Sequence, residues 1–284
     1  MTTTVAGALA DARARGVELL DAQLLLARVL ATTRTALIAH GERPLAADEH
    51  ERWSAWLRRR SAGEPVAYLL GEKEFHGLVL EVSPDVLVPR PETELVVDWA
   101  SELLGQLAEQ ARGDRDGGPS VVDLGTGSGA IALALKGLHP QARVVGIDVS
   151  AAALAVAARN AARTGLAIEL VAGSWWDGAG GRSFDVALAN PPYIAAGDPH
   201  LAALRHEPML ALSPGGDGLQ ALRTIVGGAR AHLLPGGWIV LEHGFDQGAA
   251  VRDLLARAGL AAIETRRDLA GQERATAGRR PGAA

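Results

Sequence analysis

The chain has 284 residues with 28 basic and 33 acidic side chains, which gives a formal net charge of −5. At roughly 150 residues per domain, this length allows one large domain or two modest ones. The absence of cysteine excludes disulfides, thiolate metal ligands and a cysteine nucleophile. No apolar run reaches the ~18 residues of a membrane-spanning helix, and the early charges Asp11 and Arg13 are atypical of a secretory signal. We expect a cytoplasmic protein, and the acidic balance argues against extended wrapping of nucleic acid.

The first part of the chain, residues 1 to about 72, has the periodicity of helices. Glycine and proline interrupt this pattern near Gly41 and Pro44 and again at Gly63 and Pro65. Two sets of apolar residues share a helical face and are predicted to be core: Leu20, Leu24, Ala27 and Ala31, and then Trp53, Trp56 and Leu57.

A short β-hairpin is predicted next, because apolar and polar residues alternate in Phe75–Val82 and Val86–Val88. The connection between the two segments would be Ser83-Pro84-Asp85. A helix should then begin within Pro89–Glu94, where proline comes early and acidic residues occupy the first turn. The expected division is a helical domain over 1–72, a hairpin linker over 73–90 and a second domain over 91–284.

The second domain alternates between expected strands and helices, after a glycine-rich surface loop at 111–119. This alternation is typical of an α/β fold with a parallel sheet and helices on both faces. Ligands bind such sheets beyond the carboxyl ends of the strands. The last eight residues, 277–284, are expected to form a frayed tail. Strands are expected at Val121–Leu124, Arg143–Ile147, Ile168–Val171, Phe184–Ala189 and Trp238–Leu241, and helices at Ile131–Leu138 and before Arg163.

A glycine-rich loop connects the first of these strands to its helix, in the segment Asp123-Leu124-Gly125-Thr126-Gly127-Ser128-Gly129. Its G-x-G-x-G spacing differs from the G-x-G-x-x-G of dinucleotide sites, where a helix N-terminus holds a pyrophosphate. An acid at the start of the segment suits a ligand with a cationic amino group. Asp148 ends the next strand, where a carboxylate can accept both hydroxyls of a ribose. An adenosyl group with an amino-acid tail and no phosphate is S-adenosylmethionine, and Trp175 is the predicted wall for its adenine, with Trp176 as the alternative.

The tetrapeptide Asn190-Pro191-Pro192-Tyr193 directly follows a predicted strand and indicates the methyl acceptor. The two prolines remove amide donors, so this loop offers mainly carbonyl oxygens. The side-chain oxygen of Asn190 and the carbonyl of Pro191 can together accept both hydrogens of a planar NH2 group. Tyr193 would present a flat face to that group. The expected reaction is N-methylation of an amide or an exocyclic amine, driven largely by positioning.

These motifs resemble the class I S-adenosylmethionine-dependent methyltransferases, and most specifically the PrmC/HemK family of peptide chain release factor glutamine N5-methyltransferases. The resemblance extends over nearly the whole chain. Its segments are Glu64–Tyr68, Glu74–Leu78, Val86–Glu94, Asp123–Leu133, Asn190–Ile194, Glu207-Pro208, Leu241–Gly244 and Gln247-Gly248.

The resemblance implies a Rossmann-like methyltransferase domain, a small N-terminal helical domain and a β-hairpin that joins them. It implies that the glutamine of the Gly-Gly-Gln loop of release factors is methylated, and that the helical domain and hairpin dock the release factor. Ser174 departs from the family pattern, because relatives often have an acid there. Carried over by position, Gly125, Thr126, Gly127, Ser128, Gly129, Asp148, Trp175 and Asn190 would contact the cofactor, and Asn190, Pro191, Pro192 and Tyr193 would hold the glutamine.

Three other functions are compatible with parts of the sequence. A nucleic-acid amino-methyltransferase uses the same tetrapeptide on adenine or guanine, but residues 1–90 hold eleven basic and twelve acidic side chains and give no basic groove. A non-catalytic binding module would not need Asn190. A metal hydrolase would draw on His200, His206 and Glu207, which lack the His-Glu-x-x-His spacing.

Several features remain open at this level. Glu242 and His243 end a strand at the expected ligand edge, where either packing or support of the site would explain them. Arg90 would face the substrate or pair with a nearby acid. A monomer is the default expectation, and the preferred release factor is not encoded in any motif.

Overall fold

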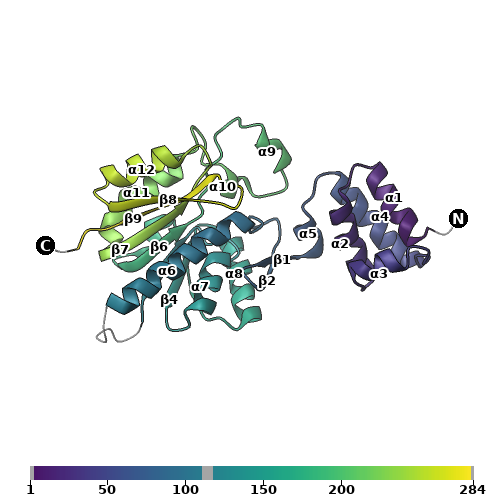
Figure 1. Cartoon of the computed structure of the whole chain (residues 1–284), viewed down its shortest axis with the longest axis horizontal. Helices are drawn as coiled ribbons and strands as arrows, with labels where there is room; N and C mark the ends of the chain where they lie inside the picture. The colour runs from purple at the N-terminus through teal and green to yellow at the C-terminus, as the bar shows by residue number, and fades with distance from the viewer. Residues whose placement is uncertain (1–2, 111–117, 283–284) are drawn as a thin grey trace. The chain divides into compact units, whose positions relative to one another are not determined.

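The computed structural model describes residues 3–110 and 118–282, which form two compact units, Met1–Glu72 and Lys73–Ala284 (Figure 1). The predicted loop at 111–119 lies mostly outside the described residues. No helix within the described ranges combines the length and apolar character needed to cross a membrane.

The first unit consists of five helices around a small apolar core. Trp53 and Leu57 are buried there, as the sequence predicted, whereas of the predicted stripe around the second helix only Ala27 is buried. Leu20 and Leu24 are exposed, because the helix turns a different face, with Leu25 and Leu26, into the core. The helices are α1 (Val5–Ala14), α2 (Leu19–Val29), α3 (Arg34–Ala39), α4 (Ala47–Ser61) and α5 (Val66–Leu70).

The hairpin is shorter than predicted and turns at a different place. It pairs β1 (Glu72–Phe75) with β2 (Leu78–Glu81). The two residues between them, His76 and Gly77, both have positive φ, 48° and 77°. This conformation matches the twist of a two-residue hairpin loop, so the strands close before the predicted Ser83-Pro84-Asp85 connection.

The second unit is built on a seven-stranded sheet in the order β5-β4-β3-β6-β7-β9-β8. The first five strands in this order are parallel, and β9 is antiparallel to both neighbours. The predicted tail at 277–284 is therefore wrong, since its first residues belong to β9, where Ala277 is buried. The strands are β3 (Ser120–Leu124), β4 (Arg143–Asp148), β5 (Glu169–Ala172), β6 (Phe184–Ala189), β7 (Leu233–Glu242), β8 (Ala261–Arg267) and β9 (Glu273–Arg279).

Two apolar layers cover the faces of this sheet, because side chains alternate along each strand. Val121 and Val186 face the layer formed by α6 (Glu94–Gln110) and α7 (Ala130–Leu138). Val122 and Ala187 face the opposite layer, formed with α11 (Gln220–His232) and α12 (Gly248–Arg257). Figure 1 shows these helices on the two sides of the sheet, which is the arrangement predicted for an α/β fold. The remaining elements are η1 (Pro91–Thr93), α8 (Ala151–Thr164), η2 (Trp175–Ala179), α9 (His200–Ala203) and α10 (Met209–Leu212).

The strand register brings the candidate motifs together. Leu124 pairs with Ile147, and Asp148 pairs with Ala172, so β3, β4 and β5 end at the same edge of the sheet. The order of the strands reverses between β3 and β6. Ligand sites of open α/β sheets form at such a switch point, beyond the carboxyl ends of the strands.

Candidate active site

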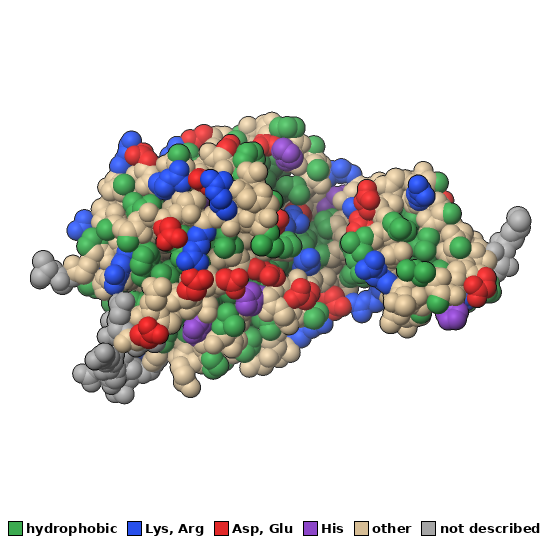
Figure 2. Space-filling model, viewed as in Figure 1, with side chains coloured by type: hydrophobic (Ala, Val, Ile, Leu, Met, Phe, Trp, Pro, Cys, Tyr) green, Lys and Arg blue, Asp and Glu red, His purple; other side chains and the backbone are tan. Residues whose placement is uncertain are grey.

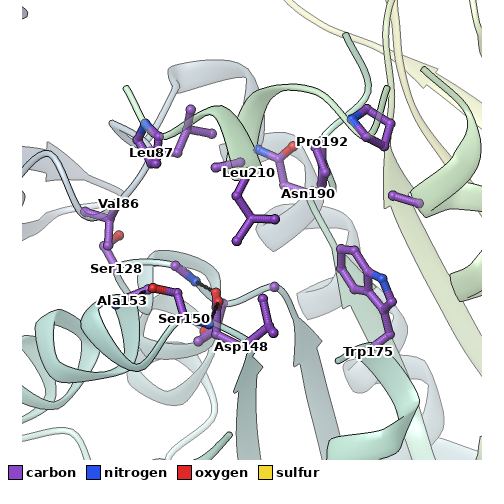
Figure 3. A pocket seen from close by; sticks show the side chains of 18 of the residues that line it. Val86, Leu87, Ser128, Asp148, Ser150, Ala153, Trp175, Asn190, Pro192 and Leu210 are labelled. Carbon is purple, nitrogen blue, oxygen red and sulfur yellow. Dashed lines mark hydrogen bonds between the residues drawn. The ribbon is translucent and has the colours of Figure 1, made fainter. Parts of the chain in front are cut away.

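A cavity of about 400 Å³ lies at this edge of the second unit (Figure 3). Figure 3 shows Asn190 and Pro192 on one side of it and Asp148 with Ser150 on the other. Its lining joins segments that are far apart in the sequence, among them those that follow β2, β3, β4, β5 and β6. The residues that line it include Asp85–Leu87, Pro89, Thr93, Gly125–Ser128, Asp148–Ser150, Ser174, Trp175, Asn190, Pro192, Pro208, Leu210, Ala211, Ser213 and Pro214.

The glycine-rich loop is fastened to the end of β4. The amides of Gly125 and Thr126 both donate to Ile147 O, at 2.8 and 2.9 Å. Gly125 has φ of 77°, and a Cβ placed on it would lie 3.2 Å from the ring of Trp175. Glycine is therefore required here both for the backbone conformation and for the close approach of the ring.

Asp148 lines one wall of the cavity. Its Oδ2 accepts a hydrogen bond from the amide of Gly127 at 2.9 Å, and its Oδ1 accepts one from the amide of Ser150 at 2.9 Å. A carboxylate has about four acceptor positions, so these two bonds orient the group and leave capacity for ligand hydroxyls.

The two adjacent tryptophans have separate roles in the structure. Trp175 lines the cavity, with φ of 47° at the start of η2. Trp176 is buried in the core, where its Nε1 donates to Ile225 O at 2.7 Å and its ring stacks on His232. Of the two, Trp175 has the location that an adenine wall requires.

The side-chain amide of Asn190 is oriented by a residue that the sequence analysis did not select. Asn190 Nδ2 donates to the hydroxyl of Thr93, and the two atoms are 3.0 Å apart. Thr93 is buried at the end of η1, directly before α6, and also lines the cavity. The only sequence signal for Thr93 was its place within the Val86–Glu94 segment of the family resemblance. With Nδ2 engaged, Oδ1 is the atom that Asn190 can offer to a ligand as an acceptor.

Not all of the predicted site residues line the cavity. Pro192 lines the cavity, whereas Gly129, Pro191 and Tyr193 are not among its lining residues. The hydroxyl of Tyr193 instead donates to Oε1 of Glu242 at 3.2 Å. Its burial and the nearby carboxylate raise the pKa of Tyr193, which keeps it a phenol.

Glu242 and His243, which the sequence left open, are both buried at the end of β7. His243 Nε2 hydrogen-bonds with the hydroxyl of Thr276 at 2.8 Å, and Nδ1 lies 2.8 Å from Gly244 O, which fits a packing role. Glu242 differs from it because its carboxyl reaches Tyr193 of the tetrapeptide.

Asp123 does not line the cavity, so its position does not match that of a direct partner for a cationic amino group. It is buried, and its Oδ2 accepts a hydrogen bond from the hydroxyl of Thr126 at 2.7 Å. Burial raises the pKa of this carboxyl to about 7, with a smaller contribution from Asp148 in the same direction.

Arg90 forms an ion pair with Glu207, whose side chain is almost completely buried. The other oxygen of Glu207 accepts a hydrogen bond from the amide of Val88 at 3.0 Å. This pair connects the segment after the hairpin with the segment 208–214, two parts of the cavity wall. Within residues 3–110 and 118–282, no group of three or more histidine, aspartate or glutamate side chains is arranged to hold a metal ion.

The cavity fits an adenosyl ligand on the basis of its own shape and groups. Gly127 has φ of 54°, a conformation that favours glycine, and the space beside it is open, so the loop presents bare backbone to the cavity. Trp175 and Leu210 add apolar walls, and Asp148 supplies acceptor oxygens. Together these match an aromatic base, a ribose and a polar tail.

Two family models match the chain. "PrmC N-terminal domain" matches residues 4–71, and "Methyltransferase small domain" matches residues 93–264. Among solved structures, a methyltransferase from Pyrococcus furiosus has a TM-score of 0.51 at 17% identity and covers 81% of this chain and 98% of its own. A 16S rRNA N2 methyltransferase from T. thermophilus, solved with AdoMet and guanosine, has a TM-score of 0.52 at 21% identity, and the match covers 74% of this chain and 49% of that one. Both similarities concern the fold.

Similar proteins with curated names span almost the entire chain. One from Xylella fastidiosa, named release factor glutamine methyltransferase, is 49% identical over 278 residues, which are 97% of this chain and 98% of that protein. Proteins with the same name from Burkholderia pseudomallei and Pseudomonas aeruginosa are 48% and 46% identical and cover 95% and 91% of both chains. The chain belongs to the release factor glutamine methyltransferase family, with an α/β methyltransferase unit and a PrmC-type N-terminal domain.

Proposed function

We propose that this protein transfers a methyl group from S-adenosylmethionine to the side-chain amide nitrogen of the glutamine in the Gly-Gly-Gln loop of peptide chain release factors. The observation that carries the proposal is the hydrogen bond from Asn190 Nδ2 to Thr93, at the border of a cavity suited to an adenosyl ligand. The names of relatives that are nearly half identical over the whole chain support the same acceptor.

The cofactor would be held by the glycine-rich loop, Asp148 and Trp175. The amides and bare backbone of Gly125–Gly129 would border its amino-acid tail, with Thr126 and Ser128 in the same loop, and the carboxylate of Asp148 would accept the ribose hydroxyls. Trp175 would cover the adenine, and Ser174 or nearby backbone would replace the acid that relatives often have. When bound, S-adenosylmethionine supplies a methyl group on a sulfonium centre.

The tetrapeptide would bind the acceptor. Asn190 Oδ1 and the carbonyl of Pro191 would accept the two hydrogens of the glutamine NH2 group, which favours a pyramidal nitrogen with its lone pair free to react. Pro192 would border the acceptor as part of the cavity wall. Tyr193 would hold the tetrapeptide in place through its hydrogen bond to Glu242. The nitrogen of the methylated amide cation is strongly acidic and would lose its proton to water, so positioning is the main contribution of these residues.

We further propose that the unit Met1–Glu72 docks the body of the release factor while the Gly-Gly-Gln loop of the release factor enters the cavity. The surface chemistry agrees with a protein partner. Figure 2 shows acidic and basic side chains interspersed over the face in view, whereas proteins that track a nucleic-acid backbone present a basic groove.

The decisive experiment is an incubation of the purified protein with a release factor and cofactor, followed by mass spectrometry of the release-factor peptides. We expect one methyl group on the glutamine of the Gly-Gly-Gln loop. A release factor with that glutamine replaced by alanine is the control and should remain unmodified. Label transferred to RNA or DNA, with none in the release factor, would refute the proposed acceptor.

A further inference from the structure

A buried carboxylate lies behind the tetrapeptide, outside the lining of the cavity. Glu242, at the end of β7, is 1% exposed, and its Oε1 accepts the hydrogen bond from Tyr193. Its Oε2 has no partner in full hydrogen-bonding geometry among the described residues. Burying a carboxyl that is incompletely hydrogen-bonded costs stability, and perturbed acids of this kind concentrate at functional sites.

Thr93 is placed between this carboxyl and Asn190. Its oxygen already accepts a hydrogen bond from Asn190 Nδ2. The Thr93 hydroxyl also lowers the pKa of the Glu242 carboxyl, which is the effect of a hydroxyl hydrogen directed at a carboxylate, although the two groups do not meet full hydrogen-bonding geometry. The Asn190 amide thus donates to the Thr93 oxygen, and the Thr93 hydroxyl hydrogen is left for Glu242.

We propose that Glu242 is a positioning residue that determines, through Thr93, which end of the Asn190 side chain faces the methyl acceptor. This inference rests on the proposed function and adds a residue that acts without touching the substrate. An ionised carboxylate only accepts hydrogen bonds, so a Thr93 hydroxyl directed at it can only be the donor. Thr93 then remains an acceptor for Asn190 Nδ2, and Asn190 Oδ1 is left to accept from the glutamine NH2 group.

A protonated Glu242 would relax this constraint. It could donate to Thr93, and Thr93 could donate to Asn190 Oδ1, which would turn the Asn190 NH2 group toward the NH2 group of the substrate. The groups that face Glu242 are Tyr193, Thr93, Arg274 on β9 and Glu92 on η1. Burial dominates among these influences and raises the pKa of Glu242 to about 7. The Glu242–Thr93–Asn190 series, called the relay below, would therefore hold Asn190 in the productive orientation above neutral pH and lose this effect below it.

Three substitutions test the relay. Glu242→Gln replaces the carboxylate, which can only accept hydrogen bonds, with an amide that can also donate. Thr93→Val removes the hydroxyl at similar size, and Thr93→Ser retains the hydroxyl. Glu273→Gln on β9 is the matched control, because Glu273 is a partly exposed carboxylate paired with Arg252, away from the cavity. The readouts are kcat for release-factor methylation from pH 6 to 9, KM for the release factor, the Kd of S-adenosylmethionine, and the melting temperature.

We expect Thr93→Val and Glu242→Gln to lower kcat at pH 8 by roughly 10- to 100-fold, the scale of a misoriented reacting group, with the cofactor Kd within about twofold of wild type. Wild type, Thr93→Ser and Glu273→Gln should gain activity as the pH rises through about 7, and Glu242→Gln should lose this rise.

Unchanged kcat and an unchanged pH profile in Glu242→Gln would overturn the proposal. If that variant does not fold, equal kcat values for Thr93→Val and Thr93→Ser would overturn it instead. A wild-type protein that modifies RNA rather than a release factor would refute the proposed function alone, and the same variants would then be compared on the acceptor that takes the methyl group.

Discussion

Asn190 and Thr93 are joined by a hydrogen bond of 3.0 Å, although 97 residues separate them in the sequence. The contact links the tetrapeptide that follows β6 with the first turn leading into α6, so the acceptor side of the cavity is built from two motifs. Each motif alone leaves the orientation of the Asn190 amide undetermined. Their contact fixes it, and the first prediction follows from this geometry.

Replacing Asn190 with alanine should separate chemistry from cofactor binding. We expect Asn190→Ala to lower kcat by roughly 10²–10³, the scale for loss of one preorganised hydrogen-bonding group in an active site. Calorimetry should give nearly the wild-type Kd for S-adenosylmethionine, because Asp148 and the glycine-rich loop are unchanged. Wild-type turnover in this variant would remove Asn190 from the role proposed for it.

Replacing Asp148 with alanine should weaken cofactor binding. The variant loses the acceptors for the Gly127 and Ser150 amides as well as those for the ribose, so the cofactor Kd should rise by at least about tenfold, or 1.4 kcal/mol. Asp253→Ala is a suitable control because Asp253 is exposed and pairs with Arg257 on α12. Equal affinity in the Asp148 and Asp253 variants, measured by calorimetry, would contradict the ribose contact.

Adding a methyl group at Gly125 should damage the cofactor site directly. A Cβ there would crowd the Trp175 ring at 3.2 Å and would require a left-handed backbone, at φ of 77°. Gly165, with φ of 70° and open space around it, offers a control with the same backbone strain. Both alanine variants should lose about 1 kcal/mol of unfolding free energy, while cofactor affinity falls in Gly125→Ala alone. Matching affinities would indicate that the Gly125–Trp175 contact is unimportant.

The buried carboxyl of Asp123 should make stability depend on pH. Its folded-state pKa is raised from 3.8 to about 7, so the folded protein binds the proton more tightly than the unfolded chain. The stabilisation is complete below the unfolded pKa and is lost as the pH rises through about 7. Relative to Asp123→Asn, wild type should therefore lose unfolding free energy between pH 5 and 8, on the order of a few kcal/mol. Urea denaturation from pH 5 to 8 tests this prediction, with Asp253→Asn as the control. A difference in unfolding free energy between wild type and Asp123→Asn that stays constant with pH would refute it.

Loss of the Arg90–Glu207 ion pair should destabilise the methyltransferase unit. Arg90→Ala leaves the nearly buried Glu207 carboxylate with the Val88 amide and without its cation, which should cost about 2 kcal/mol after allowance for the partly exposed arginine. Arg257→Ala, which removes an exposed pair with Asp253, should cost less than about 1 kcal/mol. Equal losses in the two variants would show that Glu207 is solvated.

The parallel strands were predictable because buried strands are short apolar runs bounded by turn residues. Phe184–Ala189 has the same limits in the sequence interpretation and in the structure. β9 was missed because its inward residues, such as Ala275 and Ala277, are too small to give a strong hydrophobic pattern. On α2, leucines occur on more than one face, so periodicity alone did not identify the face with Leu25 and Leu26.

The candidate site was predictable where a motif follows a strand, since the sheet then determines its location. Asp148, Trp175 and Asn190 border one cavity for this reason. Thr93 and Glu242 contact the tetrapeptide from distant segments of the chain. Such tertiary contacts cannot be predicted from a local sequence pattern. The same holds for Arg90, whose partner lies 117 residues further along the chain.

The position of β9 between β7 and β8 makes the edge of the sheet depend on a segment near the end of the chain. β8 precedes β9 in the chain, yet it is joined to the rest of the sheet only through its pairing with β9, which in turn pairs with β7. A deletion of Glu273–Arg279 would therefore remove two ladders and release β8 as well. Insertions for labelling or immobilisation belong in the exposed turn between the two strands, around Leu269–Gly271, where neither ladder is interrupted.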